Sequence, residues 1–200
     1  TLSPDNLVQA AKKRGVTALA LTDINNTSCA VEFVKKCREA GIKPLLGTDF
    51  RTGEKRQLYI GIAKNADGLY ELNKLLTECS LEGKKLPGNP PLMPNTHIIF
   101  PRLIKPISEF KENEYLGIRP EHVHRLFSSE VRHFPHKLVM LSPVTFLDEE
   151  GYKTHQLLRC IDLNIVLGRL THKDVAKKTA LFHPPDVLRD FYKLYPKIIQ

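Results

Sequence analysis

The sequence predicts an α/β fold in which parallel strands alternate with helices. Val16–Leu21 is a short apolar run bounded by polar residues, which suits a strand buried on both faces, and Ile42–Phe50 has the composition of a second strand. The segment between them has apolar residues at helical spacing and ends at Gly41. The order strand, helix, strand favours a parallel sheet, and ligands of such sheets gather at the carboxyl ends of the strands.

The first elements follow in order from the N-terminus. We expect Ser3 to cap a helix that begins at Pro4 and closes at Gly15, ahead of the first strand. A polar loop, Thr22–Thr27, comes next. The second helix is expected to turn these apolar residues inward: Val31, Phe33, Val34, Cys37 and Ala40.

The middle of the chain continues the alternation. Gln57–Ala63 is expected to form a strand, and the turn Asn65–Gly68 leads into a helix around Leu69–Leu81. Residues 83–96 form a Pro-rich loop with stiff, extended backbone. Short strands are expected near His97–Phe100 and Tyr115–Ile118.

The last third begins with a helix predicted from Pro120 and a core strand at Lys137–Leu141. Asp148 is expected to cap a long helix, and residues 184–200 form a tail whose helix follows Pro184. The long helix and the residues just after it carry an apolar set: Leu157, Leu158, Cys160, Ile161, Ile165, Val166 and Leu167.

The composition is that of a globular protein with an excess of positive charge. The chain has 200 residues, 42% of them hydrophobic, and a formal charge of +8. No apolar run reaches the roughly 18 residues that a membrane span needs, and the four cysteines are too widely spaced for a zinc ribbon, so we interpret them as reduced, buried thiols. The charge favours an anionic partner, but the basic residues are scattered, so only a salt-sensitive, sequence-independent contact with DNA is expected.

Four segments carry a resemblance to a known family. They are LVQAAKKRGVTALALTDINNTSCAVEFVKKCREAGIKPLLGTDF, LYIGIAKNADGLYELNKLLTECSLEG, ENEYLGIRPEHVHRL and THQLLRCIDLNIVLGRL. The chain resembles the PHP domain that opens the alpha subunit of bacterial DNA polymerase III, in a compact variant. The likeness covers nearly the whole chain as one PHP-type domain, 1–200, and residues 1–82 are its most specific part.

The resemblance implies a fold and a setting. The fold is a distorted (β/α) barrel of parallel strands with surrounding helices. The family's first strand, with an HxH motif, would precede Thr1, so we interpret the chain as a fragment. The resemblance also implies a bacterial, cytoplasmic polymerase that uses magnesium, with the rest of the alpha subunit, other replisome subunits and DNA as partners and no membrane. The chain has no Asp-x-Asp pair, so it cannot supply a two-metal nucleotidyl transfer site by itself.

The resemblance also locates a metal site, which can be tested residue by residue. At the family's TDH loop this chain keeps Asp23 but has Ile24 in place of the histidine, and at the GxE position it has Asp49. At the late D-x-H motif the matching residues are Pro143 and Thr145. An isoleucine, a proline and a threonine are not credible ligands for zinc, manganese or iron.

Asp23 and Asp49 are therefore vestigial candidates for metal binding. Asn25 and Asn26 would add neutral oxygens that suit only a weakly bound, magnesium- or calcium-like ion. The alternative for Asp23 is hydrogen bonding to nearby loop or helix N–H groups, and for Asp49 it is a surface carboxylate paired with a nearby Lys or Arg. We favour these alternatives. We interpret the histidines, among them His122, His124, His133, His136 and His155, as surface or packing residues.

Two functions follow as hypotheses. The first is a structural and interaction domain of a DNA polymerase III alpha subunit, catalytically silent by itself and with no cofactor. The second is an active metal-dependent phosphoesterase or 3′–5′ proofreading exonuclease that uses Asp23 and Asp49. A stand-alone histidinol-phosphatase-like enzyme fits less well, because the AKN and ENEYLGIRPE segments resemble the polymerase type.

Overall fold

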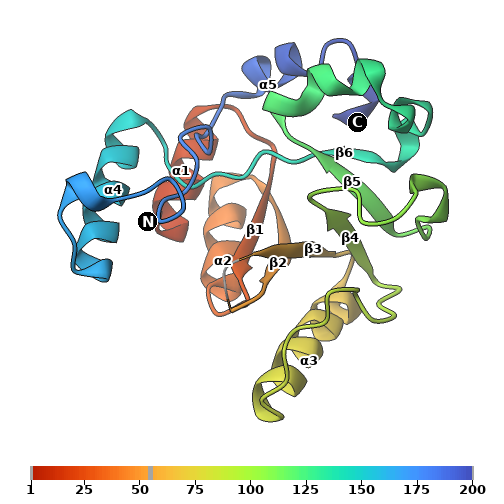
Figure 1. Cartoon of the computed structure of the whole chain (residues 1–200), viewed down its shortest axis with the longest axis horizontal. Coiled ribbons are helices and arrows are strands. Elements are labelled where there is room, and N and C mark those ends of the chain that lie inside the picture. Colours follow the sequence, from red (N-terminus) through yellow and green to blue (C-terminus); the bar gives the residue numbers. More distant parts are fainter. Residues whose placement is uncertain (1, 54–55, 200) are drawn as a thin grey trace.

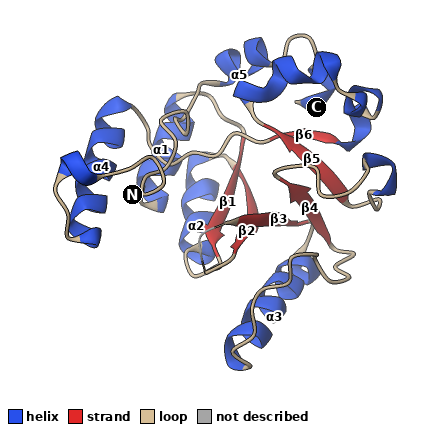
Figure 2. Ribbon diagram, viewed as in Figure 1, coloured by secondary structure: helices blue, strands red, loops and turns tan. Residues whose placement is uncertain are grey.

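A computed structural model describes residues 2–53 and 56–199 of the chain. Its strands form a six-stranded sheet in the order β1-β2-β3-β4-β5-β6, which curls so that helices lie along its outer side (Figures 1 and 2). The strands are β1 (Ala18–Ile24), β2 (Lys43–Arg51), β3 (Gln57–Ala63), β4 (Thr96–Phe100), β5 (Glu114–Ile118) and β6 (Leu138–Met140). The α-helices are α1 (Pro4–Lys13), α2 (Ala30–Ala40), α3 (Ala66–Leu81), α4 (Glu149–Leu163) and α5 (Pro185–Phe191).

The predicted α/β class is confirmed, with one difference in strand direction. β1 pairs with β2 in parallel, and β4, β5 and β6 are parallel to one another. β3 is antiparallel to both of its neighbours. The physical reason is the short connection between β2 and β3, because a parallel pairing would need a crossover of a dozen or more residues.

Two predicted helix caps, Ser3 and Asp148, are present, and a third occurs at Asn65, where residues 65–68 were predicted as a turn but form the cap and first turn of α3. The Ser3 hydroxyl accepts a hydrogen bond from the Asn6 amide at the start of α1. The Asn65 side chain accepts one from Gly68 at the start of α3, at 2.9 Å. The Asp148 carboxylate does the same for α4. Each cap satisfies an N–H group that has no partner within its own helix.

The buried apolar residues form two clusters. The smaller one packs α1 and α2 against β1 and β2 and includes Val8, Phe33 and Cys37. The larger one packs α3 against β3 and β4 and includes Phe50 and Leu72. Burial raises the pKa of the Cys37 thiol, in keeping with the predicted role of this cysteine as a packing residue.

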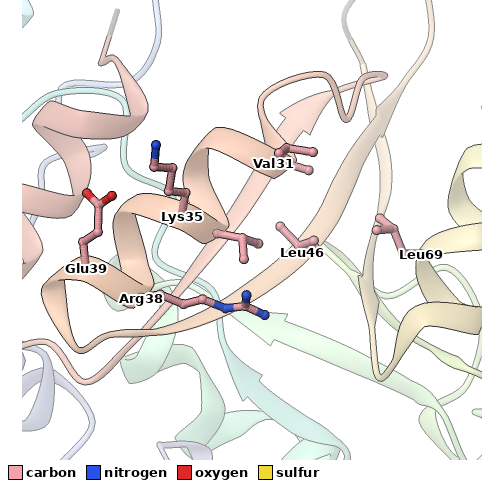
Figure 3. A pocket seen from close by; sticks show the side chains of 8 residues that line it. Val31, Lys35, Arg38, Glu39, Leu46 and Leu69 are labelled. Atoms are coloured by element: carbon pink, nitrogen blue, oxygen red, sulfur yellow. The ribbon is translucent and has the colours of Figure 1, made fainter.

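Several residues predicted to be buried are exposed. β1 lies at the edge of the sheet and all seven of its residues are exposed or only partly covered, so the prediction of a strand buried on both faces is wrong. Val31 was expected to point inward but is 83% exposed, and it lines an open groove with Leu46 and Leu69 between α2, β2 and α3 (Figure 3). The apolar set of α4 is also largely exposed, with Cys160 as its buried member.

The segment after β5 forms another type of helix than the one predicted. The helix predicted from Pro120 is a 3-10 helix, η2 (Pro120–Ser128), followed by a second one, η3 (Glu130–His133). The tail packs back on the sheet: Tyr192 is fully buried and its hydroxyl donates a 2.6 Å hydrogen bond to the Ile118 carbonyl. Four further 3-10 segments complete the described elements: Ile107–Glu109, Pro135–Lys137, Leu167–Arg169 and Pro196–Ile198. None of the helices in the described residues has the length and apolar character that crossing a membrane requires.

Candidate metal centre

The candidate centre lies at the carboxyl ends of β1 and β2. β1 extends through Ile24, so Asp23 and Ile24 are strand residues and the predicted loop begins later, at Asn25. The strand is longer than predicted because it pairs with β2 as far as Ile24 opposite Asp49. The backbone hydrogen bonds of this pairing outweigh the low strand preference of an aspartate.

The pairing register places Asp23 and Asp49 on opposite faces of the sheet. Asp23 is opposite Thr48, and Ile24 is opposite Asp49. Paired residues of neighbouring strands point to the same face, and successive residues alternate. Asp23 is therefore on the face of the helices, where Leu21 packs, while Asp49 and Ile24 share the inner face of the curled sheet. The two carboxylates cannot bind one metal ion together.

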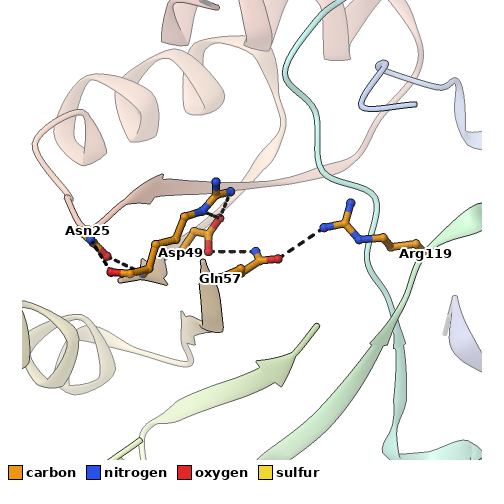
Figure 4. Close-up of polar contacts among 5 residues, drawn as sticks. Asn25, Asp49, Gln57 and Arg119 are labelled. Carbon is orange, nitrogen blue, oxygen red and sulfur yellow. Dashed lines mark hydrogen bonds and ion pairs between the residues drawn. The ribbon is translucent and has the colours of Figure 1, made fainter. Parts of the chain in front are cut away.

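The Asp49 side chain accepts three hydrogen bonds from two residues, Arg51 and Gln57 (Figure 4). Arg51 donates to the Asp49 Oδ2 atom from Nε at 2.9 Å and from Nη2 at 2.6 Å. Gln57 donates to Oδ1 at 2.9 Å, and the Gln57 amide oxygen accepts a 3.4 Å hydrogen bond from Arg119. The Asp49 residue is only 6% exposed. Its charge is thus buried and compensated by a guanidinium group, which is the arrangement that a buried carboxylate needs.

The side chains of Asn25 and Asn26, in the loop after β1, form hydrogen bonds with backbone groups. Asn25 has a left-handed φ of 50°, and its side chain makes two hydrogen bonds with the backbone of Arg51, at 2.8 and 3.0 Å. The Asn26 side chain accepts a 2.7 Å hydrogen bond from the Ser28 amide. The oxygens that were candidates for a weak cation site are therefore occupied in fixing the turn.

Asp23 is half-buried, and burial raises the pKa of its carboxyl group above the ordinary value. Within the described residues its carboxylate has no hydrogen-bond partner, so the predicted contact with loop N–H groups is not formed. Ile24 is 54% exposed and turns an apolar side chain toward the inner face beside Asp49.

The remaining candidate positions follow β6. Pro143 and Thr145 lie in an extended segment after this strand, and the Thr145 amide donates to the Ala180 carbonyl at 2.9 Å. The next residue, Phe146, forms a parallel bridge with Leu181. These positions connect the sheet to the segment before α5 through backbone contacts.

The histidines are dispersed. His122 and His124 are on η2, and the Nε2 atom of His155 accepts a 3.2 Å hydrogen bond from Ala176. His97 packs against the Tyr115 ring at 5.4 Å, and burial lowers its pKa. Across residues 2–53 and 56–199, no three His, Cys, Asp or Glu side chains are grouped closely enough to hold a metal ion.

We call the region around Asp49, at the carboxyl ends of β1 and β2, the corner. Three of its residues were not predicted from the sequence: Arg51, Gln57 and Arg119. A sequence signal for Arg51 exists, because residues two apart in a strand share a face and Arg51 follows Asp49 by two. Gln57 and Arg119 approach only through the pairing of β2 with β3 and the curl of the sheet, which the sequence pattern did not reveal.

The side chains present at this corner do not fit a divalent cation. A cationic guanidinium already contacts Asp49, and the neighbouring residue on the same face is Ile24. Magnesium and zinc sites in proteins use several carboxylate, imidazole or thiolate ligands around one point. Among the described residues, Asp49 is the one carboxylate on this face of the corner, and both of its oxygens accept hydrogen bonds.

The fold and this corner define a class of protein. The sequence profile of the PHP domain matches residues 1–106, which is more than half of the chain. The chain belongs to the PHP domain family.

Relatives of the chain are bacterial DNA polymerases. An error-prone DNA polymerase of Symbiobacterium thermophilum is 40% identical over 86 residues, which are 42% of this chain and 8% of that protein. A DNA polymerase III subunit alpha of Xylella fastidiosa is 31% identical over 93 residues, 45% of this chain and 8% of that protein. The chain thus matches less than a tenth of the length of these relatives.

A solved structure gives a weaker match. It is the structure of a protein from Bifidobacterium adolescentis that is named provisionally as a metal-dependent phosphoesterase. The TM-score is 0.32 at 21% identity, and the match covers 40% of this chain and 29% of the other.

Proposed function

We propose that the chain is the PHP domain of a bacterial DNA polymerase of the DNA polymerase III alpha or error-prone type, and that it acts there as a structural domain without a metal centre. The observation that carries the proposal is the ion pair between Asp49 and Arg51, at 2.6 Å, at the carboxyl ends of the strands. We extend the domain over residues 1–200, because the tail buries Tyr192 and Ile198 in the larger core cluster.

The ion pair favours a structural role for a physical reason. A metal ion that used Asp49 would have to displace Arg51 and bring a second positive charge close to the guanidinium group. At a few ångströms two like charges repel by about 4 kcal/mol at an effective dielectric constant near 20. Ile24 offers no lone pair in return. Asp49 therefore supports the fold, with Arg51 in the position that a cation would take.

In this proposal the polymerase reaction belongs to the rest of the parent polypeptide, which would hold the catalytic magnesium ions and the main contacts with DNA. The PHP domain would supply a rigid body that packs on that polypeptide and offers surfaces to other replisome subunits. The setting would be the bacterial cytoplasm, where such polymerases copy the chromosome.

The test is metal analysis of the purified protein after exposure to zinc and manganese and extensive dialysis. We expect far less than one metal ion per chain, and an unchanged content in an Asp49→Asn variant. The control is Arg56→Gln, which changes an exposed residue and shows whether purification and dialysis alone alter the metal content. One tightly bound zinc or manganese ion per chain, lost on Asp49→Asn substitution, would overturn the proposal.

The competing hypothesis is an active phosphoesterase or exonuclease, and it has its own test. Asp23→Ala and Asp49→Ala are combined in one variant, and hydrolysis of a 3′-labelled oligonucleotide is measured with manganese present. We expect no metal-dependent hydrolysis by the unaltered protein. Hydrolysis that the double variant lacks, although it is folded by circular dichroism, would establish the enzyme instead.

A further inference from the structure

The segment formed by η2 and η3 presents an aromatic side chain to solvent. Phe127 is 77% exposed, although it lies in an ordered 3-10 helix between the buried residues Val123, Leu126 and Val131. These neighbours anchor the backbone in the larger core cluster. Phe127 is therefore held outward by a fixed scaffold, so its ring is available to a partner.

One arginine lies over this ring, and a second is exposed two residues before it in the sequence. The Arg132 guanidinium lies over the Phe127 ring, 5.9 Å from its centroid, and Arg132 Nη1 donates a hydrogen bond to the Phe127 carbonyl. Arg125 is exposed on the same 3-10 helix. Neither guanidinium forms an ion pair with a carboxylate in the described part of the chain. Both have N–H groups left for an external anion.

The wider segment is basic. Residues 119–137 contain four Lys or Arg and four His against two Glu. One of these glutamates, Glu121, is already paired with Lys177 at 3.8 Å, which brings the basic segment 173–178 beside η2. The unbalanced positive charge attracts a polyanion, and it does so next to an exposed aromatic ring.

A hollow opens where η2 ends and η3 begins. It begins at Ser128, the residue after Phe127, has a volume of about 460 Å³, and is lined by Ile107, Phe134 and the hydroxyl-bearing Ser108 and Ser129. This volume lies within the range of small-ligand sites, and the mixture of apolar walls and hydroxyl groups suits a planar heterocycle. The Glu130 carboxylate at its wall would repel a phosphate, so a base rather than the backbone fits this hollow.

We propose that the surface formed by Arg125, Phe127, Arg132 and the adjoining hollow binds single-stranded nucleic acid. One base stacks on the free face of Phe127, the next base enters the hollow, and the two arginines contact the backbone phosphates. An exposed aromatic ring with flanking arginines is the combination by which proteins bind single strands without sequence preference. The proposal does not depend on the state of Asp49, so metal analysis and this test can fail independently.

The test is fluorescence anisotropy with a labelled oligothymidylate of about 12 nucleotides, within the usual site size of single-strand binders. We expect salt-sensitive binding that Phe127→Ala weakens by about tenfold, since one base–aromatic stack contributes about 1–3 kcal/mol. Phe127→Trp, which keeps an aromatic ring at this position, is expected to bind the oligonucleotide as tightly as the unaltered protein. Tyr70→Ala, which removes a 65% exposed aromatic residue on α3, is the matched control and should leave binding unchanged.

The arginines are tested through salt dependence. Arg125→Gln and Arg132→Gln should each reduce the slope of log affinity against log salt by about 0.7, while Arg38→Gln on α2 should not. Absence of binding at low salt would overturn the proposal. Equal binding of duplex DNA or heparin, with no loss in Phe127→Ala, would also overturn it, because the surface would then respond to charge alone.

Discussion

Replacement of Arg51 by methionine tests how far the fold depends on the pair with Asp49. The substitution keeps most of the side-chain stem and removes two of the hydrogen bonds that Asp49 accepts, at 2.6 and 2.9 Å. Removing one partner of a buried ion pair costs about 3–5 kcal/mol. The Arg51 side chain is 30% exposed and Gln57 keeps its bond to Asp49. We therefore expect a loss of about 2–3 kcal/mol in the free energy of unfolding, below that range, because the pair is partly exposed and Asp49 keeps one partner.

The assay is urea unfolding followed by circular dichroism, with the free energy taken from the linear dependence on urea. The double variant Asp49→Asn, Arg51→Met should recover part of the loss, because no charge is then left buried without a partner. Lys178→Met, which breaks an exposed pair with Glu149, is the control and should leave the curve unchanged. If Arg51→Met behaves like this control, Asp49 does not depend on Arg51 and the reasoning is refuted.

Three further predictions concern the rest of the fold. Burial lowers the pKa of His155 in the folded protein, so the neutral imidazole contributes stability that is fully present above the unfolded pKa of about 6.5 and declines as the pH falls through the folded pKa. His155→Gln should therefore flatten the dependence of the unfolding free energy on pH in this range. An unchanged slope in the variant would contradict this prediction. A Cβ on Gly68 would lie 2.1 Å from the Asn95 carbonyl oxygen, so Gly68→Ala should lower the melting temperature by several degrees, whereas Gly88→Ala, with open space around it, should not. Asn65→Ala removes the cap of α3 and should cost about 1 kcal/mol in urea unfolding; a loss near zero would show that the cap is not needed.

Local rules predicted much of the fold. The caps Ser3 and Asp148 could be predicted because each needs only its own side chain and the next helical turn. Gln57–Ala63 was predicted with its observed bounds, because its apolar run has turn residues on both sides.

Long-range features escaped prediction. The direction of β3 depends on which strands pair, and the exposure of Val31 and of the α4 face depends on what covers them. The spacing of apolar residues in the sequence indicates which residues can be buried, but it does not identify the neighbours that cover them. The partners of Asp49 illustrate the same limit, since Arg119 lies 62 positions from Gln57.

The reversed strand β3 also bears on how this protein folds. Asp49 and Gln57 are eight positions apart, and Arg51 is two positions from Asp49. Closing so short a loop costs little entropy, and contacts between nearby residues form early, whereas the parallel pair β1 and β2 must wait for a helical crossover. We therefore expect the corner to assemble while the outer strands are still unpaired. Because Arg51, the counter-ion of Asp49, lies only two positions away, this part of the chain can fold without binding a metal ion from the cell.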